Sequence, residues 1–399
     1  MLGVNRKICD LCEECIKACP FKAIEVKDGY VEINAACKLC KICIKRCPKN
    51  AIVFIDGKRP EVNKDEWKGI MVYVEHVDGK IHPVTFELIG KAVELASKIN
   101  QPVYSIFIGC EIKDKANELL YYGVDKVFVY DDEQFKYFRA DVYANAFEDC
   151  IKKIKPSIVL VGATSMGRSL APRVSVRFRT GLTADCTVLD IRENTDLVQI
   201  RPAFGGNIMA QIVTPNSRPQ FATVRYKVMD RAKCAENPKG TVELCTMPPN
   251  KLSSGINVIK VVPKEQQPSI SDAEVIVAGG RGLKDKKDLD MLEELAQLLG
   301  GQTAVSRPLV EAGWMPYTKQ IGLSGRTVRP KLIITCGISG AVQFTACMNT
   351  SDCIIAINKD KNAPIFKIAH YGIVGDLYEV IPALIEQIKN KEGVACNAI

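Results

Sequence analysis

One cysteine pattern occurs twice within the first 50 residues of this chain. The stretch CDLCEECIKACP, residues 9–20, is followed by CKLCKICIKRCP, residues 37–48. Both copies have the spacing Cys-x2-Cys-x2-Cys-x3-Cys-Pro, and both continue into an alanine, an isoleucine and a short β-prone stretch. Three thiolates at this spacing can wrap one face of an iron–sulfur cubane, while the fourth points elsewhere. The doubled pattern therefore predicts two [4Fe-4S] clusters in the first 60 residues.

Zinc is the alternative ligand for such cysteines. Structural zinc sites usually combine two Cys-x2-Cys pairs across a longer loop and close a single tetrahedral shell, which this triple spacing fits poorly. Residues 1–60 resemble a bacterial two-cluster ferredoxin, an α+β module. The resemblance implies that each copy gives its fourth cysteine to the other cluster. One cluster would then be held by Cys9, Cys12, Cys15 and Cys47, and the second by Cys37, Cys40, Cys43 and Cys19.

The remaining cysteines show no ligand spacing, and we interpret them as small buried hydrophobic residues. They are Cys110, Cys150, Cys186, Cys234, Cys245, Cys336, Cys347, Cys353 and Cys396. The sequence has no apolar run of the roughly 18 residues that a membrane span needs and no apolar stretch typical of a signal peptide. We therefore expect a soluble, cytoplasmic protein without a membrane partner, in which cysteines serve redox chemistry rather than disulfides.

The net charge of +8 raises the question of nucleic-acid binding. Residues 1–60 hold 12 Lys or Arg against seven Asp or Glu, so +5 of the excess lies in the cysteine-rich part. An oxidised four-iron cluster with four thiolates carries a charge of about −2, so two clusters nearly cancel this excess. The basic balance is thereby explained without a nucleic-acid partner.

The middle of the chain, residues 68–250, has the pattern of a doubly wound, Rossmann-like α/β domain. Apolar, β-branched strands alternate with amphipathic helices, as in a parallel sheet that is covered on both faces. We expect strands at 69–76, 102–109, 126–131 and 157–163 and helices at 85–99, 113–122 and 141–154. The stretches CTVLDI, LVQIRP, NIMAQIV and QFATVR after Ala184 are expected to form an antiparallel extension.

A glycine- and hydroxyl-rich stretch, GATSMGRSLAPR at 162–173, follows the last of these strands and opens a helix. A doubly wound sheet presents backbone N–H groups to a ligand at such a position. Packing of a helix start against a neighbouring chain explains the same residues equally well. Both interpretations stay open from the residues alone.

A polar, proline-bearing linker, residues 251–270 within the longer stretch 246–272, separates this domain from a second α/β run over 271–399. Three glycine turns occur in that run: AGGRGL, QIGLSG and CGISGA. Glycine turns at the carboxyl ends of parallel strands suit a long dinucleotide.

The motifs GATSMGRSLAPR, TGLTADC, AGGRGL, SRP, QIGLSG, GISGAVQF, AINKD and HYGIVGDL occur in this order. Residues 68–395 thereby resemble the alpha subunit of electron transfer flavoproteins. With its ferredoxin-like start, the chain is most similar to bifurcating members such as the flavoprotein subunit of caffeyl-CoA reductase complexes. A lactate-dehydrogenase-linked relative is the close alternative.

The resemblance implies that the C-terminal domain binds FAD. It assigns the pyrophosphate to Arg281, the isoalloxazine to Ser306 and Arg307, and flavin N5 to the Ser324 hydroxyl. The full set that it implies is Arg281, Ser306, Arg307, Gln320, Ile321, Gly322, Leu323, Ser324, Gly325, Ser339, Gly340, Ala341, Val342, Gln343, Phe344, Asn358, Asp376 and Leu377. Of these, 339–343 lie under the ring, Asn358 by the ribityl chain and phosphates, and Asp376 and Leu377 at the adenosine end.

Two positions depart from the family pattern. Leu323 stands where glutamine is usual, and Phe344 stands where many members have a histidine that donates to the pyrimidine end of the flavin. Phenylalanine cannot donate a hydrogen bond. We therefore expect less stabilisation of negative charge at that end of the ring, with Arg307 setting the potential instead.

The family also implies a function. A beta subunit with its own FAD and NADH site would form a heterodimer with this chain. One electron would pass to soluble ferredoxin, and the other would pass through the FAD of this chain to an acyl-CoA-dehydrogenase-like reductase. The chain would be an electron-transfer subunit without a complete active site, and we expect no catalytic residues in it. A non-bifurcating iron–sulfur carrier and an iron–sulfur sensor fused to a nucleotide-binding scaffold are the rival interpretations.

Overall fold

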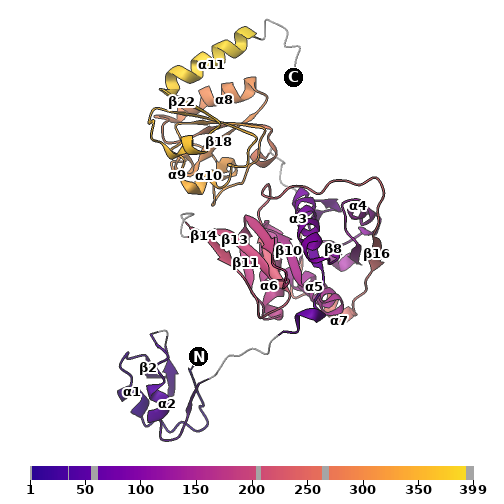
Figure 1. The fold of residues 1–399 in the computed structure, drawn as a ribbon, viewed down its shortest axis with the longest axis vertical. Helices are drawn as coiled ribbons and strands as arrows, with labels where there is room; N and C mark the ends of the chain where they lie inside the picture. The colour runs from indigo at the N-terminus through magenta and orange to yellow at the C-terminus, as the bar shows by residue number, and fades with distance from the viewer. Residues whose placement is uncertain (1, 35, 55–61, 204–207, 263–268, 392–399) are drawn as a thin grey trace. The chain divides into compact units, whose positions relative to one another are not determined.

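The computed structural model describes residues 2–34, 36–54, 62–203, 208–262 and 269–391 (Figure 1). The chain divides into two compact units, residues 1–62 and residues 63–399. Cys396 and residues 263–268 of the expected linker lie outside the described ranges.

The first unit is a small α+β fold whose two halves repeat each other. Strands β1 (Leu2–Val4) and β4 (Ile52–Phe54) pair antiparallel, and β2 (Ile24–Lys27) and β3 (Tyr30–Ile33) form a hairpin. The short helices α1 (Glu14–Lys17) and α2 (Ile42–Arg46) each carry the third cysteine of one sequence copy. Both cysteines, Cys15 and Cys43, belong to the apolar core of the unit, so the sequence repeat is also a structural repeat.

The first domain of the second unit is built on a seven-stranded parallel sheet with the order β11–β15–β10–β5–β8–β9–β16. Its strands are β5 (Ile70–Val74), β8 (Val103–Gly109), β9 (Lys126–Asp131), β10 (Ile158–Gly162), β11 (Leu182–Cys186), β15 (Gln220–Val224) and β16 (Thr241–Leu244). The helices are α3 (Pro83–Ile99), α4 (Asn117–Leu120), α5 (Ala140–Ile154) and α6 (Ser165–Arg177). A short hairpin, β6 (His76–Val77) and β7 (Lys80–Ile81), follows the central strand.

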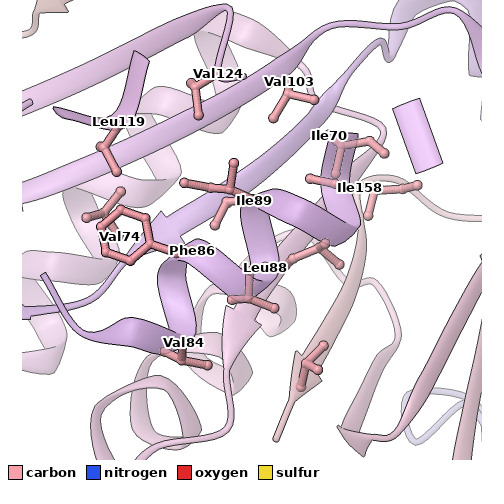
Figure 2. Close-up of a cluster of buried hydrophobic side chains, with 14 of the residues drawn as sticks. Ile70, Val74, Val84, Phe86, Leu88, Ile89, Val103, Leu119, Val124 and Ile158 are labelled. Carbon is pink, nitrogen blue, oxygen red and sulfur yellow. The ribbon is translucent and has the colours of Figure 1, made fainter. Parts of the chain in front are cut away.

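Each face of this sheet has its own core. Figure 2 shows the core beneath α3, where Phe86, Leu88 and Ile89 pack against Ile70 and Val74 of β5 and their neighbours. Aromatic side chains of α5 and of the 3-10 turn η3 (Glu133–Phe135) fill the opposite face, together with apolar side chains of α6. The predicted helices at 85–99 and 141–154 are confirmed within two residues, whereas 113–122 contains only a 3-10 turn and the short α4.

One part of the expected antiparallel extension is wrong. Strands β12 (Val188–Ile191), β13 (Leu197–Ala203) and β14 (Ile208–Ile212) do form an antiparallel sheet. QFATVR, by contrast, forms β15, which lies between β10 and β11 in the parallel sheet. All five residues of β15 are buried, as expected for a strand that is covered on both faces. The sequence TVEL, for which the pattern predicts no strand, adds the edge strand β16.

The C-terminal domain is a second parallel sheet with the order β19–β18–β17–β20–β21–β22. The strands are β17 (Val275–Gly279), β18 (Gln302–Ser306), β19 (Gln320–Ile321), β20 (Leu332–Cys336), β21 (Cys353–Asn358) and β22 (Tyr371–Val374). Helices α8 (Leu289–Leu298) and α11 (Leu377–Lys391) pack together on one face, and α9 (Arg307–Glu311) and α10 (Val342–Thr345) are short. Strand order reverses between β17 and β20, which makes this the topological switch point.

The first residues of the segment that joins the two domains are bound to the α/β domain. Helix α7 (Pro249–Leu252) packs against α5, and the Asn145 side chain donates a hydrogen bond to the Lys251 carbonyl. The hydroxyl of Ser254 donates to Asp141 at 2.7 Å. Residues 246–255 are therefore held on the α/β domain rather than free.

The scattered cysteines are only partly buried, contrary to our expectation. Cys150, Cys186, Cys336 and Cys347 are buried, whereas Cys110, Cys245 and Cys353 are partly exposed and Cys234 is exposed. Cys234 lies in the loop that joins β15 to β16, outside any helix or strand. Within the described ranges, no helix is long and apolar enough to cross a membrane.

Candidate functional site

A cavity of about 640 Å³ lies at the carboxyl ends of the strands in the C-terminal domain. Residues that directly follow β17, β18, β20, β21 and β22 line it, together with β19 and the turn after it. Parallel strands place their carboxyl ends at one edge of the sheet, so segments distant in sequence meet there. Its volume falls in the range of cofactor pockets.

Three glycines allow the backbone to close up at the switch point. The Gly280 N–H donates to the Cys336 carbonyl at 3.0 Å, and the Gly282 N–H donates to the Gly337 carbonyl at 3.0 Å. A Cβ on Gly280 would lie 2.5 Å from the Gly337 oxygen, and Gly337 itself has φ +63°. Side chains at these positions would push the AGGRGL and CGISGA turns apart.

Most of the residues that the sequence assigned to FAD line this cavity. They are Arg281, Ser306, Arg307, Gln320, Ile321, Gly322, Leu323, Ser324, Ser339, Ala341, Gln343, Phe344, Asn358, Asp376 and Leu377. Gly325, Gly340 and Val342 are absent from the lining. The two glycines shape its turns instead, because a Cβ on Gly325 would lie 2.4 Å from the Gln320 oxygen and one on Gly340 would lie 2.3 Å from the Ile365 nitrogen.

The lining also contains residues that sequence reasoning missed. They are Gly282, Pro308, Gly337, Ile338, Lys359, Asp360, Ala363, Pro364, Gly375 and Tyr378. Most directly follow the carboxyl end of a strand or lie next to an assigned residue, and Asp360, Ala363 and Pro364 come later in the segment after β21. The positions of the strand ends were therefore the signal that could have found them.

The turn at Ser324 is held by hydrogen bonds from several sides. The Gln320 side-chain amide donates to the Ser324 hydroxyl at 2.9 Å, so this bond does not use the hydroxyl proton. The Tyr317 hydroxyl donates to the Ser324 carbonyl, and the Leu323 N–H donates to the Gln343 carbonyl at 2.9 Å. The turn is thus preorganised before any ligand binds.

Two assigned side chains mainly organise backbone. The Asn358 amide donates to the Ile338 carbonyl at 3.0 Å, and its oxygen accepts from the Asp360 N–H at 3.0 Å. The Asp376 carboxylate accepts from the Tyr378 N–H at 3.0 Å, near the start of α11. Both residues line the cavity and also fix the loops that form its wall.

Phe344 has a dual position. It lines the cavity, yet it is only 5% exposed and packs in an apolar cluster with Ile321, Ile338 and Met348. Phenylalanine at this site is therefore also part of the core. The sequence alone did not show this second role.

In the first unit, Cys9, Cys12, Cys15 and Cys47 line one small cavity. Cys47 comes from the second sequence copy, so this set contains the crossed fourth cysteine that the ferredoxin resemblance implies. Burial raises the pKa of the Cys15 thiol, and charge on Cys47 and Cys12 raises it further. These shifts hold Cys15 in its protonated form, so what fits a cofactor with several cysteine ligands is the position of the four side chains around one cavity.

The cysteines of the second expected cluster have a similar environment around Cys43. Burial raises the pKa of the Cys43 thiol, and Cys37 and Cys40 add to this effect. The fourth cysteines are matched as well: Cys47 Sγ accepts from the Ala51 N–H at 3.2 Å, and Cys19 Sγ accepts from the Ala23 N–H at 3.4 Å.

Among the residues that the structure describes, no three His, Cys, Asp or Glu side chains converge as ligands of a single metal ion. Such convergence is the geometry of a zinc site. The cysteine sulfurs of a four-iron cubane bind different iron atoms and lie farther apart than the ligands of one ion, so a thiol-lined cavity and the lack of a single-ion site are compatible.

Comparisons with known proteins agree with this geometry. Residues 70–249 match the model of the electron transfer flavoprotein domain, and residues 269–349 match that of the electron transfer flavoprotein FAD-binding domain. The chain is 45% identical to the electron transfer flavoprotein alpha subunit of Megasphaera elsdenii, over 83% of this chain and 99% of that one. The chain belongs to the electron transfer flavoprotein alpha-subunit family.

Other family members are similar over different lengths. LctC of Acetobacterium woodii, a lactate dehydrogenase (NAD(+),ferredoxin) subunit, is 56% identical over 95% of this chain and 91% of its own. An acryloyl-CoA reductase electron transfer subunit beta of Anaerotignum propionicum is 38% identical over 82% of this chain and 96% of its own. The match to LctC leaves only about 20 of the 399 residues uncovered, so it includes most of the cysteine-rich unit.

The family has an FAD-binding domain, and the cavity fits FAD on physical grounds. Arg281, Arg307 and Lys359 bring positive charge to its wall, which suits a pyrophosphate. Apolar side chains such as Ile338 and Phe344 offer a surface for a flat ring. A bound FAD would supply one-electron and two-electron redox chemistry.

Proposed function

We propose that this chain is the alpha subunit of a bifurcating electron transfer flavoprotein, with one FAD in the C-terminal domain and two [4Fe-4S] clusters in the first unit. The observation that carries the proposal is the convergence of all six strand ends of the C-terminal sheet on one dinucleotide-sized cavity in a member of this family. The chain's own residues bind, orient and tune the cofactors, and no residue of it is assigned a catalytic role.

FAD binding in this proposal uses the assigned residues that line the cavity. Arg281 faces the pyrophosphate, the Ser324 hydroxyl faces flavin N5, and Arg307 favours negative charge on the ring. Gln320 supports this arrangement because it donates to Ser324 and leaves the serine proton for the flavin.

The proposal of two clusters rests on the doubled cysteine spacing and on the cavity in the first unit. The cavity that combines Cys9, Cys12 and Cys15 with Cys47 supports the crossed ligand sets. The name of LctC includes ferredoxin, which supports ferredoxin as a redox partner of this chain. We infer that the first unit exchanges electrons with soluble ferredoxin, and that an electron transfer flavoprotein beta subunit with its own FAD supplies the NAD(H) site.

The terminal partner is better supported as a lactate dehydrogenase than as an acyl-CoA reductase. LctC is 56% identical, whereas the acryloyl-CoA reductase subunit is 38% identical and is matched over a smaller share of this chain. We therefore favour the lactate-linked alternative, with the acyl-CoA class second. Caffeyl-CoA, which the sequence resemblance placed first, is not favoured by any relative described above.

Anaerobic copurification of this chain with its beta subunit tests the proposal. We expect about eight iron atoms and one FAD bound to this chain. Electron transfer that involves both ferredoxin and NAD(H) should occur only when the lactate dehydrogenase is also present. A colourless preparation, or one that contains zinc, would contradict the cofactor assignment, and turnover with an acyl-CoA reductase alone would reassign the partner.

A further inference from the structure

Arg225 joins the two domains of the second unit at the turn that carries Ser324. It directly follows β15, at the carboxyl end of a buried strand of the α/β domain. Its Nη2 donates to the Leu323 carbonyl of the C-terminal domain at 2.8 Å, and its Nη1 lies 3.6 Å from Cys347 Sγ. The side chain is only 11% exposed.

Asp185 and Arg168 hold this guanidinium in place. Arg225 Nη2 also donates to Asp185 Oδ2 at 3.1 Å, and Asp185 accepts two further bonds at 3.0 Å from Arg168 Nη2. The Asp185 N–H in turn donates to the Thr223 hydroxyl at 2.9 Å. Arg168 belongs to GATSMGRSLAPR, so this motif supports the position of Arg225.

The Leu323 carbonyl is well placed to affect the cavity. It belongs to the peptide that links Leu323 to Ser324, and both residues line the cavity. A charged donor on this oxygen polarises the peptide, strengthens the Ser324 N–H as a donor and brings positive charge near the ring site. Within the C-terminal domain, Gln343, Gln320 and Tyr317 form hydrogen bonds with polar groups of this turn. Arg225 adds a hydrogen bond to the turn from the α/β domain.

We propose that Arg225 is a positioning residue that tunes the flavin of the C-terminal domain from the neighbouring α/β domain. The inference rests on the proposed function, in which FAD occupies the cavity. Its consequence is that the flavin potential depends on the contact between the two domains, because the bond to Leu323 exists only while that contact is made.

A second contact between the domains provides a matched control. Arg329 Nη1 lies 2.7 Å from Oδ1 of Asp230, which is 88% exposed. Arg329 belongs to the C-terminal domain and reaches the α/β domain, the reverse of Arg225, and it does not line the cavity. Arg329→Gln therefore removes a contact between domains without touching the Ser324 turn.

The test measures the potential of this flavin by spectroelectrochemical titration of the full chain in complex with its beta subunit. Arg225→Gln should weaken binding of reduced FAD relative to oxidised FAD by roughly tenfold, as expected for a charge-assisted hydrogen bond. That factor corresponds to a fall of about 59 mV for a one-electron couple. Arg225→Lys keeps the charge and should restore part of the shift, and Arg329→Gln should leave the potential unchanged.

An Arg225→Gln protein that binds FAD with an unchanged potential overturns the inference. An equal shift in Arg329→Gln also overturns it, because general domain packing would then be the cause. If Arg225→Gln does not fold, the flavin potential of Arg225→Lys is compared with that of the wild type instead, and an unchanged potential overturns the inference. Failure of the wild-type complex to bind FAD in this domain would instead refute the proposed function.

Discussion

Arg307 Nε lies 2.8 Å from Oε1 of Glu311, one turn later in α9, at the wall of the C-terminal cavity. The sequence predicted Arg307 as the cation beside the flavin but did not pair it with a carboxylate. The ion pair offsets part of the arginine charge. Since both side chains are mostly exposed, at 65% and 59%, water screens this effect.

Glu311→Gln should therefore raise the potential of the flavin slightly. Removal of the carboxylate leaves Arg307 uncompensated, which favours the more negative, reduced ring. We expect an increase of roughly 10–40 mV, equivalent to the 0.2–1 kcal/mol typical of exposed pairs. Glu294→Gln breaks a comparable exposed pair with Lys389 away from the cavity and is the control. A potential that stays the same in both variants would argue against a role for Glu311.

Phe344→His should raise the flavin potential as well, because it restores a donor near the pyrimidine end of the ring. The same change places a polar ring in the core position of Phe344, so we expect a loss of about 1–3 kcal/mol in the free energy of unfolding. Spectroelectrochemistry and urea unfolding measure the two effects separately. An unaltered potential in a folded variant would defeat the idea.

Serine variants of the cysteines can distinguish crossed from uncrossed ligand sets. If Cys9 and Cys47 share one cluster, the double variant Cys9→Ser/Cys47→Ser should lose about four of eight iron atoms. The single variant Cys9→Ser should lose the same number. Cys9→Ser with Cys37→Ser should lose both clusters. Iron and sulfide analysis gives the readout, with Cys234→Ser, an exposed cysteine elsewhere, as control. Greater iron loss from the Cys9/Cys47 pair than from Cys9→Ser alone would refute the crossing.

Gly340→Ala should weaken FAD binding by tenfold or more. Gly340 has φ +86°, and an added Cβ would meet the Ile365 nitrogen at 2.3 Å, so the 339–341 loop must shift. Gly300 is the control, since it has φ +65° but open space at its Cβ. Flavin retention during gel filtration compares the two variants, and equal retention would show that the loop tolerates the clash.

Glu87 should make the α/β domain less stable as pH rises. Burial raises its pKa from 4.5 to about 7, against the opposing effect of backbone hydrogen bonds from Lys227, Val228 and Met229. Between pH 4.5 and 7 the folded state therefore holds a proton that the unfolded state has lost, and stability falls across this window by roughly 3 kcal/mol.

Glu87→Gln should remove this dependence, because glutamine keeps a carbonyl acceptor for the Lys227 N–H. Urea unfolding at pH 5, 6, 7 and 8 measures the difference, and the variant should be the more stable protein at pH 8. Parallel pH profiles for the two proteins would show that Glu87 is not the titrating group.

The sequence by itself determined the elements with strong local signals. The doubled cysteine spacing predicted a repeated structural half, and the third cysteine of each copy does lie in a core helix. Alternation of apolar strands with amphipathic helices predicted the parallel sheets. Glycines after strands located the cavity, because strand ends in a parallel sheet share one edge.

Only the tertiary structure decided relationships between distant residues. QFATVR has the pattern of any short strand, and its place inside the parallel sheet depends on β10 and β11, which are far away in the chain. Glu311 is near Arg307 in sequence, but its pairing depends on side-chain directions that spacing does not fix. Arg225 meets Leu323 across 98 residues, a contact without any local signal. Local sequence patterns indicate which secondary structure a segment prefers. The partner of a charged side chain depends instead on which distant segments become neighbours when the sheets pack.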